Sequence, residues 1–230
     1  MRELQQAKAV QKEHVILFDL DGTLIDSTEA ILESFDRAYG YFGKTAPREE
    51  KITAEIGHPL DKMFLSLGIS DAEVWEYVAA YKTHYQKISR EKTLLLPGAE
   101  RAIIEASKFA RLGVVTTKTA KYSVELLEHM NLMRYFDVLV GREDVENPKP
   151  HPEPVLKALS KLKADAGKCW MVGDTCMDIL SAHSAGIRGI AVTSGYGSEK
   201  QLAACCQDVK KSALDAVAFI IAKSKKSNNA

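Results

Sequence analysis

The sequence contains few cysteines, and their spacing does not favour metal binding. Its 230 residues include four of them, and none form a C-x-x-C pair or a Cys/His cluster with zinc spacing. Cys205 and Cys206 are adjacent, and two ordinary thiols explain them more simply than a strained vicinal disulfide. We therefore expect no disulfide in the native protein.

The sequence also lacks long apolar runs and an excess of charge of either sign. No stretch approaches the roughly 20 apolar residues of a membrane span, and residues 1–13 lack the apolar segment of a signal peptide. We therefore expect a soluble, cytoplasmic protein. Lysine and arginine together number 31, and aspartate and glutamate together also number 31. This balance argues against a general affinity for nucleic acid or anionic membranes, which both favour a basic excess.

The composition is that of a globular protein, and its apolar runs predict a sheet. Each run is apolar without strict alternation, which is typical of strands covered by helices on both faces. The expected strands span residues 14–19, 111–116, 168–173 and 187–193, with a weaker one at 136–140. Helical patterns lie between most of them, so we predict an α/β fold with a Rossmann-like parallel sheet flanked by helices.

One long segment interrupts this alternation. Residues 27–92 contain no convincing strand but show helix-like stretches separated by glycine and proline. The sequence therefore predicts two domains. Residues 1–26 and 93–230 would form the α/β core, and residues 27–92 an inserted all-helical cap.

Two aspartates follow the first predicted strand. Asp19 and Asp21 are two residues apart, and ligands of open parallel sheets bind beyond the carboxyl ends of the strands. Crowded carboxylates raise a pKa unless a cation compensates, and hard oxygen ligands select magnesium. A simple Asp-Gly turn would explain the same residues if they stood alone.

Other strand ends carry a hydroxyl and a lysine. Thr116 and Thr117 follow the second long run, where a hydroxyl and a backbone N–H can hold an anion at a helix start. A helix N-cap is the alternative. Lys149 lies in residues 147–154, which hold four of the seven prolines. A stiff loop of this kind can present a lysine to a phosphate, or it can be only a rigid turn.

The last of these strand ends supplies two further acids. Asp174 ends the predicted strand and Asp178 lies one helical turn later, so both side chains can point to one site. Asp174 alone could be a helix N-cap. Separate explanations would have to account for four carboxylates, a lysine and a threonine hydroxyl that all fall at neighbouring strand ends. One shared site accounts for all of them. Together they suit a metal ion and a phosphate.

These motifs resemble those of the haloacid dehalogenase-like superfamily of phosphohydrolases. The order and spacing of four motifs match over nearly the whole chain: Asp19-x-Asp21-Gly-Thr23, Thr116, Lys149 and Gly173-Asp174-x-x-x-Asp178. The helical insert is similar to the cap of the first class of that superfamily. Finer features, including Leu96-Pro-Gly98, resemble its phosphoglycolate phosphatase branch.

The resemblance implies a role for each catalytic candidate. Asp19 would be the nucleophile that forms an aspartyl-phosphate, and Asp21 the general acid and then the general base. Thr116 and Lys149 would bind the transferring phosphoryl group. The branch usually has asparagine where Thr117 stands. The backbone N–H of Thr117 should still bind phosphate, but side-chain support for the neighbouring loop is in question.

The resemblance also implies a magnesium ion. Asp19, the backbone carbonyl of Asp21 and Asp174 would hold it, and Asp178 would orient these groups from nearby. His58 lies at a break in the helical insert that is expected to reach the site. It is a candidate for substrate contact, although an exposed turn histidine is the simpler interpretation.

We therefore expect a magnesium-dependent phosphatase acting on a small phosphorylated metabolite, with phosphoglycolate favoured. A phosphotransferase of the beta-phosphoglucomutase kind uses the same acids and remains an alternative, as do an inorganic pyrophosphatase and a nucleotide 5'-phosphatase. Because Asp19 and Asp21 are both present, a non-catalytic binding protein is disfavoured. We expect a monomer or a small homo-oligomer.

Overall fold

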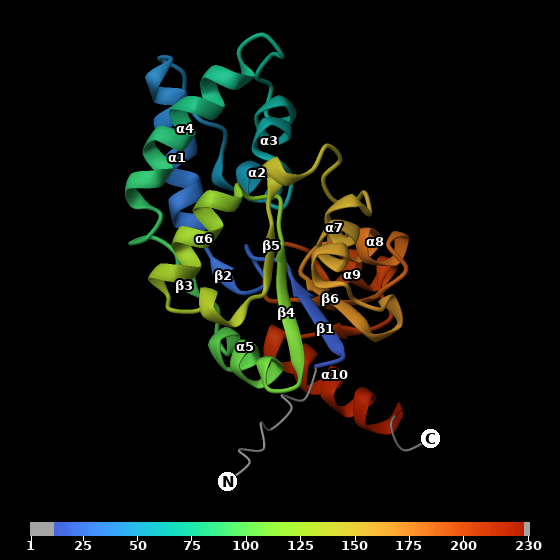
Figure 1. Ribbon diagram of the computed structural model, residues 1–230. Helices are drawn as coiled ribbons and strands as arrows, with labels where there is room; N and C mark the ends of the chain where they lie inside the picture. The colour runs from blue at the N-terminus through green and yellow to red at the C-terminus, as the bar shows by residue number, and fades with distance from the viewer. Residues whose placement is uncertain (1–11, 228–230) are drawn as a thin grey trace, which may run out of the picture.

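A parallel sheet forms the centre of the protein. The computed structural model describes residues 12–227, within which six strands pair in the order β5-β4-β1-β6-β7-β8 (Figure 1). All pairs are parallel. The strands are β1 (His14–Phe18), β4 (Ala110–Val115), β5 (Val138–Val140), β6 (Cys169–Gly173), β7 (Arg188–Val192) and β8 (Val209–Lys210). The predicted α/β fold is confirmed, and the two-residue β8 is an addition to it.

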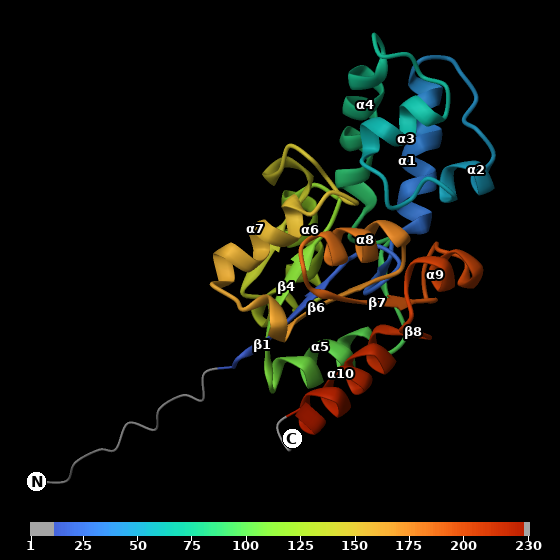
Figure 2. The ribbon, with the colours of Figure 1, turned by 90° about the vertical axis from the view of Figure 1, so that its right-hand side faces the viewer.

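Helices cover both faces of the sheet (Figure 2). In β1, Ile16 and Phe18 belong to one core cluster, whereas Val15 and Leu17 belong to another. The first cluster includes residues of α5 (Ala99–Ser107), α6 (Ala120–His129) and α10 (Ala213–Ser227), and the second includes residues of α7 (Glu153–Leu162) and α8 (Cys176–Ser184). A strand of this sheet therefore needs apolar residues throughout its length, because successive side chains pack alternately against the helices on one face and on the other.

Four helices stand above the carboxyl ends of the strands (Figure 1). They are α1 (Thr28–Tyr41), α2 (Glu49–Thr53), α3 (Leu60–Ser66) and α4 (Val74–Ile88). Their apolar faces form a separate core in which Phe35, Phe64 and Tyr81 pack ring against ring. Two short strands, β2 (Ile25–Asp26) and β3 (Leu94–Leu95), pair antiparallel just before and just after these helices.

The expectation that no disulfide forms is wrong. Cys176 at the start of α8 is bonded to Cys205 at the end of α9 (Glu199–Cys205), with their Cα atoms 5.9 Å apart. Cys206 is buried with Leu202 against β7, while Cys205 beside it reaches α8. Sequence spacing hid the pair, because 29 residues separate two cysteines that only the packing of α8 and α9 brings together.

Short 3-10 turns complete the described structure at Met133–Tyr135, Arg142–Asp144 and Ala166–Lys168. Within residues 12–227, none of the helices combines the length and apolar character that crossing a bilayer requires.

Candidate active site

Three neighbouring strands end beside one another and deliver polar side chains to one edge of the sheet. Phe18 of β1 pairs with Val114 of β4 and with Val172 of β6. Asp19, Thr116 and Asp174 follow directly after these three strands and are all buried. The structure therefore brings three of the sequence-predicted site residues to one place.

Lys149 lies buried between two of the acids. Its Nζ donates to Asp19 Oδ1 at 2.8 Å, to Asp178 Oδ1 at 2.5 Å and to the carbonyl of Val115 at 3.1 Å. Burial by itself would lower the pKa of the Lys149 ammonium, but Asp178 and Asp19 together raise it above the usual lysine value. Lys149 is thus a fixed positive charge beside Asp19.

Asp19 remains an unusually basic carboxylate despite this lysine. Burial raises its pKa to about 7, the Lys149 charge opposes that rise, and the Asp178 charge adds to it. Burial, followed by repulsion from Asp19 and Asp178, likewise raises the pKa of Asp174 well above its usual value. Lys149 pairs with Asp19 and Asp178, and Asp174 adds a third carboxylate beside them. This excess of negative charge calls for a further cation.

The three carboxylates have the composition of a divalent cation site. One oxygen each of Asp19, Asp174 and Asp178 lies within 4.8 Å of the others, and all three residues are buried. Carboxylate oxygens are the donors that magnesium prefers. Asp21, a candidate ligand through its backbone carbonyl, turns its side chain away toward other partners. The residues present therefore fit a hard divalent ion.

Two residues that the sequence reasoning missed hold Asp174. Thr23 Oγ1 donates to Asp174 Oδ1 at 3.1 Å, and the backbone N–H of Tyr196 donates to Oδ2 at 2.8 Å. Thr23 belongs to the first motif, so the sequence could have indicated it as a site residue. Tyr196 lies in a loop after β7 and showed no motif at all.

Gly22 allows the first motif to approach Asp174 this closely. Its φ is +81°, and a Cβ there would lie 2.3 Å from Asp174 Oδ2. Only glycine adopts this backbone conformation without cost and leaves the required space.

Asp178 is oriented at the start of α8. Its Oδ2 accepts hydrogen bonds from the backbone N–H of Thr175 at 3.0 Å and from Thr175 Oγ1 at 2.7 Å. Its other oxygen accepts from Lys149. Asp178 therefore connects the helix N-terminus to the lysine and positions both.

Asp21 has a different environment from Asp19. Lys118 Nζ lies 2.9 Å from Asp21 Oδ2, and Ser27 Oγ donates to Oδ1. Burial would lower the pKa of Lys118, but Asp21 and then Tyr85 raise it well above the usual lysine value. The same ammonium lies 4.8 Å from the ring centre of Tyr85 in α4. The sequence reasoning assigned no role to Lys118 or Ser27.

The side chains of the two threonines after β4 have different hydrogen-bond roles and different partners. Thr116 Oγ1 accepts the backbone N–H of Lys118 at 3.2 Å, which leaves its hydroxyl proton available to another acceptor. Thr117 Oγ1 donates to the carbonyl of Gly57 at 2.8 Å. The side-chain support in question at Thr117 is therefore present, and it ties the strand-end loop to the helical insert.

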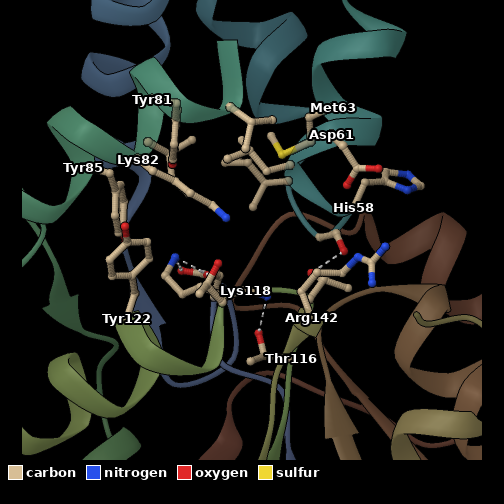
Figure 3. A pocket seen from close by; sticks show the side chains of 18 of the residues that line it. His58, Asp61, Met63, Tyr81, Lys82, Tyr85, Thr116, Lys118, Tyr122 and Arg142 are labelled. Carbon is tan, nitrogen blue, oxygen red and sulfur yellow. Dashed lines mark hydrogen bonds and ion pairs between the residues drawn. The ribbon is translucent and has the colours of Figure 1, made fainter. Parts of the chain in front are cut away.

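A cavity of about 290 Å³ lies between the strand ends and the insert. Asp19, Asp21, Thr116 and Lys118 line its floor. Residues of α1, α3, α4 and α6 line the rest, together with the loop at residues 56–58 and with Arg142 and Glu143 (Figure 3). His58 also lines it but is exposed, at the side where Asp61 and Arg142 lie. His58 therefore borders the cavity as a turn residue and not as a buried group.

Comparison with known proteins identifies the family. The model of haloacid dehalogenase-like hydrolases matches residues 16–192. This chain belongs to that family. Its family and its phosphatase-named relatives make it a phosphatase, a phosphoric monoester hydrolase.

Several curated relatives have phosphatase names. The chain is 38% identical to "Probable phosphatase IndB" of Dickeya dadantii, over 83% of this chain and 85% of the relative. It is 34% identical to pyrophosphatase PpaX of Bacillus mycoides (79% and 84% covered). It is 30% identical to phosphoglycolate phosphatase of Salmonella paratyphi A (91% and 90% covered).

The fold is likewise shared with solved structures. A haloacid dehalogenase-like family hydrolase of Streptococcus pneumoniae superposes with a TM-score of 0.81 at 26% identity, covering 90% of this chain and 98% of that one. The helical insert and the sheet are thus part of a known architecture.

Proposed function

We propose that this protein is a magnesium-dependent phosphatase that hydrolyses a small phosphomonoester through an aspartyl-phosphate on Asp19. The observation that carries the proposal is the buried contact of Lys149 with Asp19, which itself lines the floor of the cavity. A carboxylate nucleophile divides one difficult displacement into two easier steps. The lysine beside it attracts the phosphate and balances its charge.

The chain's own residues account for the two steps. Asp19 attacks phosphorus while the P–O bond to the leaving alcohol breaks, and Asp21 gives that oxygen a proton. Asp21 then takes a proton from water, which attacks the aspartyl-phosphate and releases inorganic phosphate. Throughout, Lys149 and the hydroxyl of Thr116 bind the phosphoryl oxygens, and the N–H of Thr117 adds a further donor.

Asp19, Asp174 and the backbone carbonyl of Asp21 would hold the magnesium ion, with Asp178 orienting Lys149 beside them. When bound, magnesium supplies positive charge that lets an anionic carboxylate approach an anionic phosphate. The three clustered carboxylates support this assignment.

Residues 27–92 act in this proposal as a lid on a core made of residues 1–26 and 93–230. The separate apolar core of α1–α4 and the paired strands β2 and β3 at their base support this division. A lid over the strand ends would exclude water during transfer to Asp19.

The substrate is a small phosphorylated metabolite. The motif resemblance favours phosphoglycolate, and a relative named phosphoglycolate phosphatase supports this candidate, while a relative named pyrophosphatase supports pyrophosphate as a second. A nucleotide 5'-phosphatase and a sugar-phosphate mutase use the same floor residues and differ only in what the insert admits.

The decisive experiment measures phosphate release from a generic aryl phosphate with and without magnesium. We expect Asp19→Asn to abolish release, because an amide cannot form the aspartyl-phosphate. Asp36→Asn is the matched control, since Asp36 is exposed on α1. Undiminished turnover in Asp19→Asn would overturn the proposal.

A further inference from the structure

The upper part of the cavity is apolar, in contrast to its floor. Ile31, Ile56, Met63, Val78 and Tyr81 line it from the helical insert, and all five are at least 94% buried. A ligand with apolar surface would bind here by removing that surface from water. A fully polar ligand would leave these side chains without a matching partner.

The volume also exceeds what the smallest candidate substrates need. An apolar cavity of about 150 Å³ holds a benzene molecule, and this one measures about 290 Å³. It therefore has room for a phosphoryl group on the floor and a ring-sized body above it. Phosphoglycolate carries only a two-carbon acid, and pyrophosphate carries no carbon at all.

Aromatic side chains flank this space. Tyr85 of α4 and Tyr122 of α6 lie with ring centres 5.8 Å apart on one side of the cavity (Figure 3). Trp75, which is 63% exposed, lines it as well. Flat rings of this kind favour contact with a cyclic ligand.

One lysine of the helical insert interrupts the apolar wall. Lys82 of α4 extends into the cavity above Lys118 (Figure 3). No hydrogen bond, ion pair or ring contact of Lys82 occurs among the residues that the structure describes, whereas Lys118 is paired with Asp21. An unpaired ammonium directed into a ligand cavity favours an anionic acceptor on the ligand.

We infer that the substrate's leaving alcohol has a ring-sized apolar body and carries a carboxylate that binds Lys82. This inference rests on the proposed function and concerns only the part of the substrate above the phosphoryl group. The apolar wall selects the ring, and Lys82 selects the carboxylate.

The test compares esters of primary alcohols, so that intrinsic leaving-group reactivity is similar. The probes are benzyl phosphate, 3-carboxybenzyl phosphate and phosphoglycolate, each assayed for kcat/KM with magnesium. We expect 3-carboxybenzyl phosphate to exceed phosphoglycolate at least about tenfold from ring burial. It should also exceed benzyl phosphate about tenfold from the charged hydrogen bond.

Variants separate the two sources of preference. Lys82→Met should lower the ratio of kcat/KM for 3-carboxybenzyl over benzyl phosphate about tenfold, mainly through KM. Lys87→Met on the same helix is the control, because Lys87 is exposed and outside this cavity. Val78→Ser should lower kcat/KM for both ring substrates and leave the ratio between them unchanged.

The outcomes distinguish this inference from the proposed function. Hydrolysis that depends on Asp19 but favours phosphoglycolate over both ring esters would overturn the inference alone. An unchanged ratio in Lys82→Met would overturn the carboxylate assignment. Absence of hydrolysis of every ester would overturn the proposed function and the inference with it.

Discussion

Lys118 pairs with Asp21 at 2.9 Å while its ammonium lies over the ring of Tyr85. One lysine thus connects the proposed general acid on the core to α4 of the helical insert. In the proposed mechanism Asp21 exchanges a proton with both the leaving alcohol and water, so its position relative to the cavity matters for each step.

We therefore expect Lys118→Met to lower kcat about 10- to 100-fold, since the side chain that positions Asp21 is removed. Lys118→Arg keeps the charge and should recover a substantial part of the rate. Lys121→Met is the control, because Lys121 is exposed on α6. Steady-state kinetics of the three variants provide the measurement, and equal kcat values in Lys118→Met and the control would contradict the role.

Removing Lys149 should affect both activity and stability. Lys149→Met leaves Asp19 and Asp178 buried without their cation. Breaking a buried ion pair in this way costs about 3–5 kcal/mol, and losing a phosphate-binding charge costs at least about 10²-fold in kcat. Urea unfolding and kinetics measure the two effects. A variant of wild-type stability would show that the acids are neutral or otherwise compensated.

Magnesium should stabilise the folded protein, because a ligand that binds only the native state raises its apparent stability. We expect a higher Tm with magnesium in the wild type and a loss of that increase in Asp174→Asn, which removes one of the clustered carboxylates. Asp36→Asn should keep the increase. Equal shifts in all three proteins would locate the ion elsewhere.

Two glycines with positive φ provide a matched test of the close contact with Asp174. Gly22→Ala would place a methyl group 2.3 Å from Asp174 Oδ2, whereas no atom lies within 4 Å of a Cβ at Gly43. Both substitutions carry the cost of placing alanine in a left-handed backbone conformation, about 1–2 kcal/mol. Only Gly22→Ala should abolish the magnesium-dependent Tm increase; a similar loss in Gly43→Ala would exclude the steric explanation.

The disulfide leads to a prediction of its own. Reduction should add two hydrogen atoms to the intact mass, and loss of the bond should lower the free energy of unfolding by up to about 3.5 kcal/mol for a loop of this length. Cys176→Ser, Cys205→Ser and the double variant should lose equal amounts, because each removes the same bond. Additive losses, or an unchanged mass on reduction, would contradict the pairing.

Local pattern was sufficient for most of the sheet. Residues 14–19 and 168–173 are apolar throughout because helices cover both faces, and the structure has β1 and β6 there. The two-residue strands β2 and β8 are too short to leave such a pattern. Helix α9 was also missed, since its buried surface is mainly Leu202.

The sequence by itself determined which groups meet at the strand ends. Asp19, Thr116 and Asp174 each follow a strand directly, and parallel pairing places such residues at one edge. Tertiary structure alone decided their partners. Lys118 reaches Asp21 across 97 positions, and Cys176 reaches Cys205 across 29. Such contacts depend on how helices and loops pack in space, which local periodicity does not record. The apolar wall around Lys82 arises in the same way, because it forms only when α1, α3 and α4 close over the sheet.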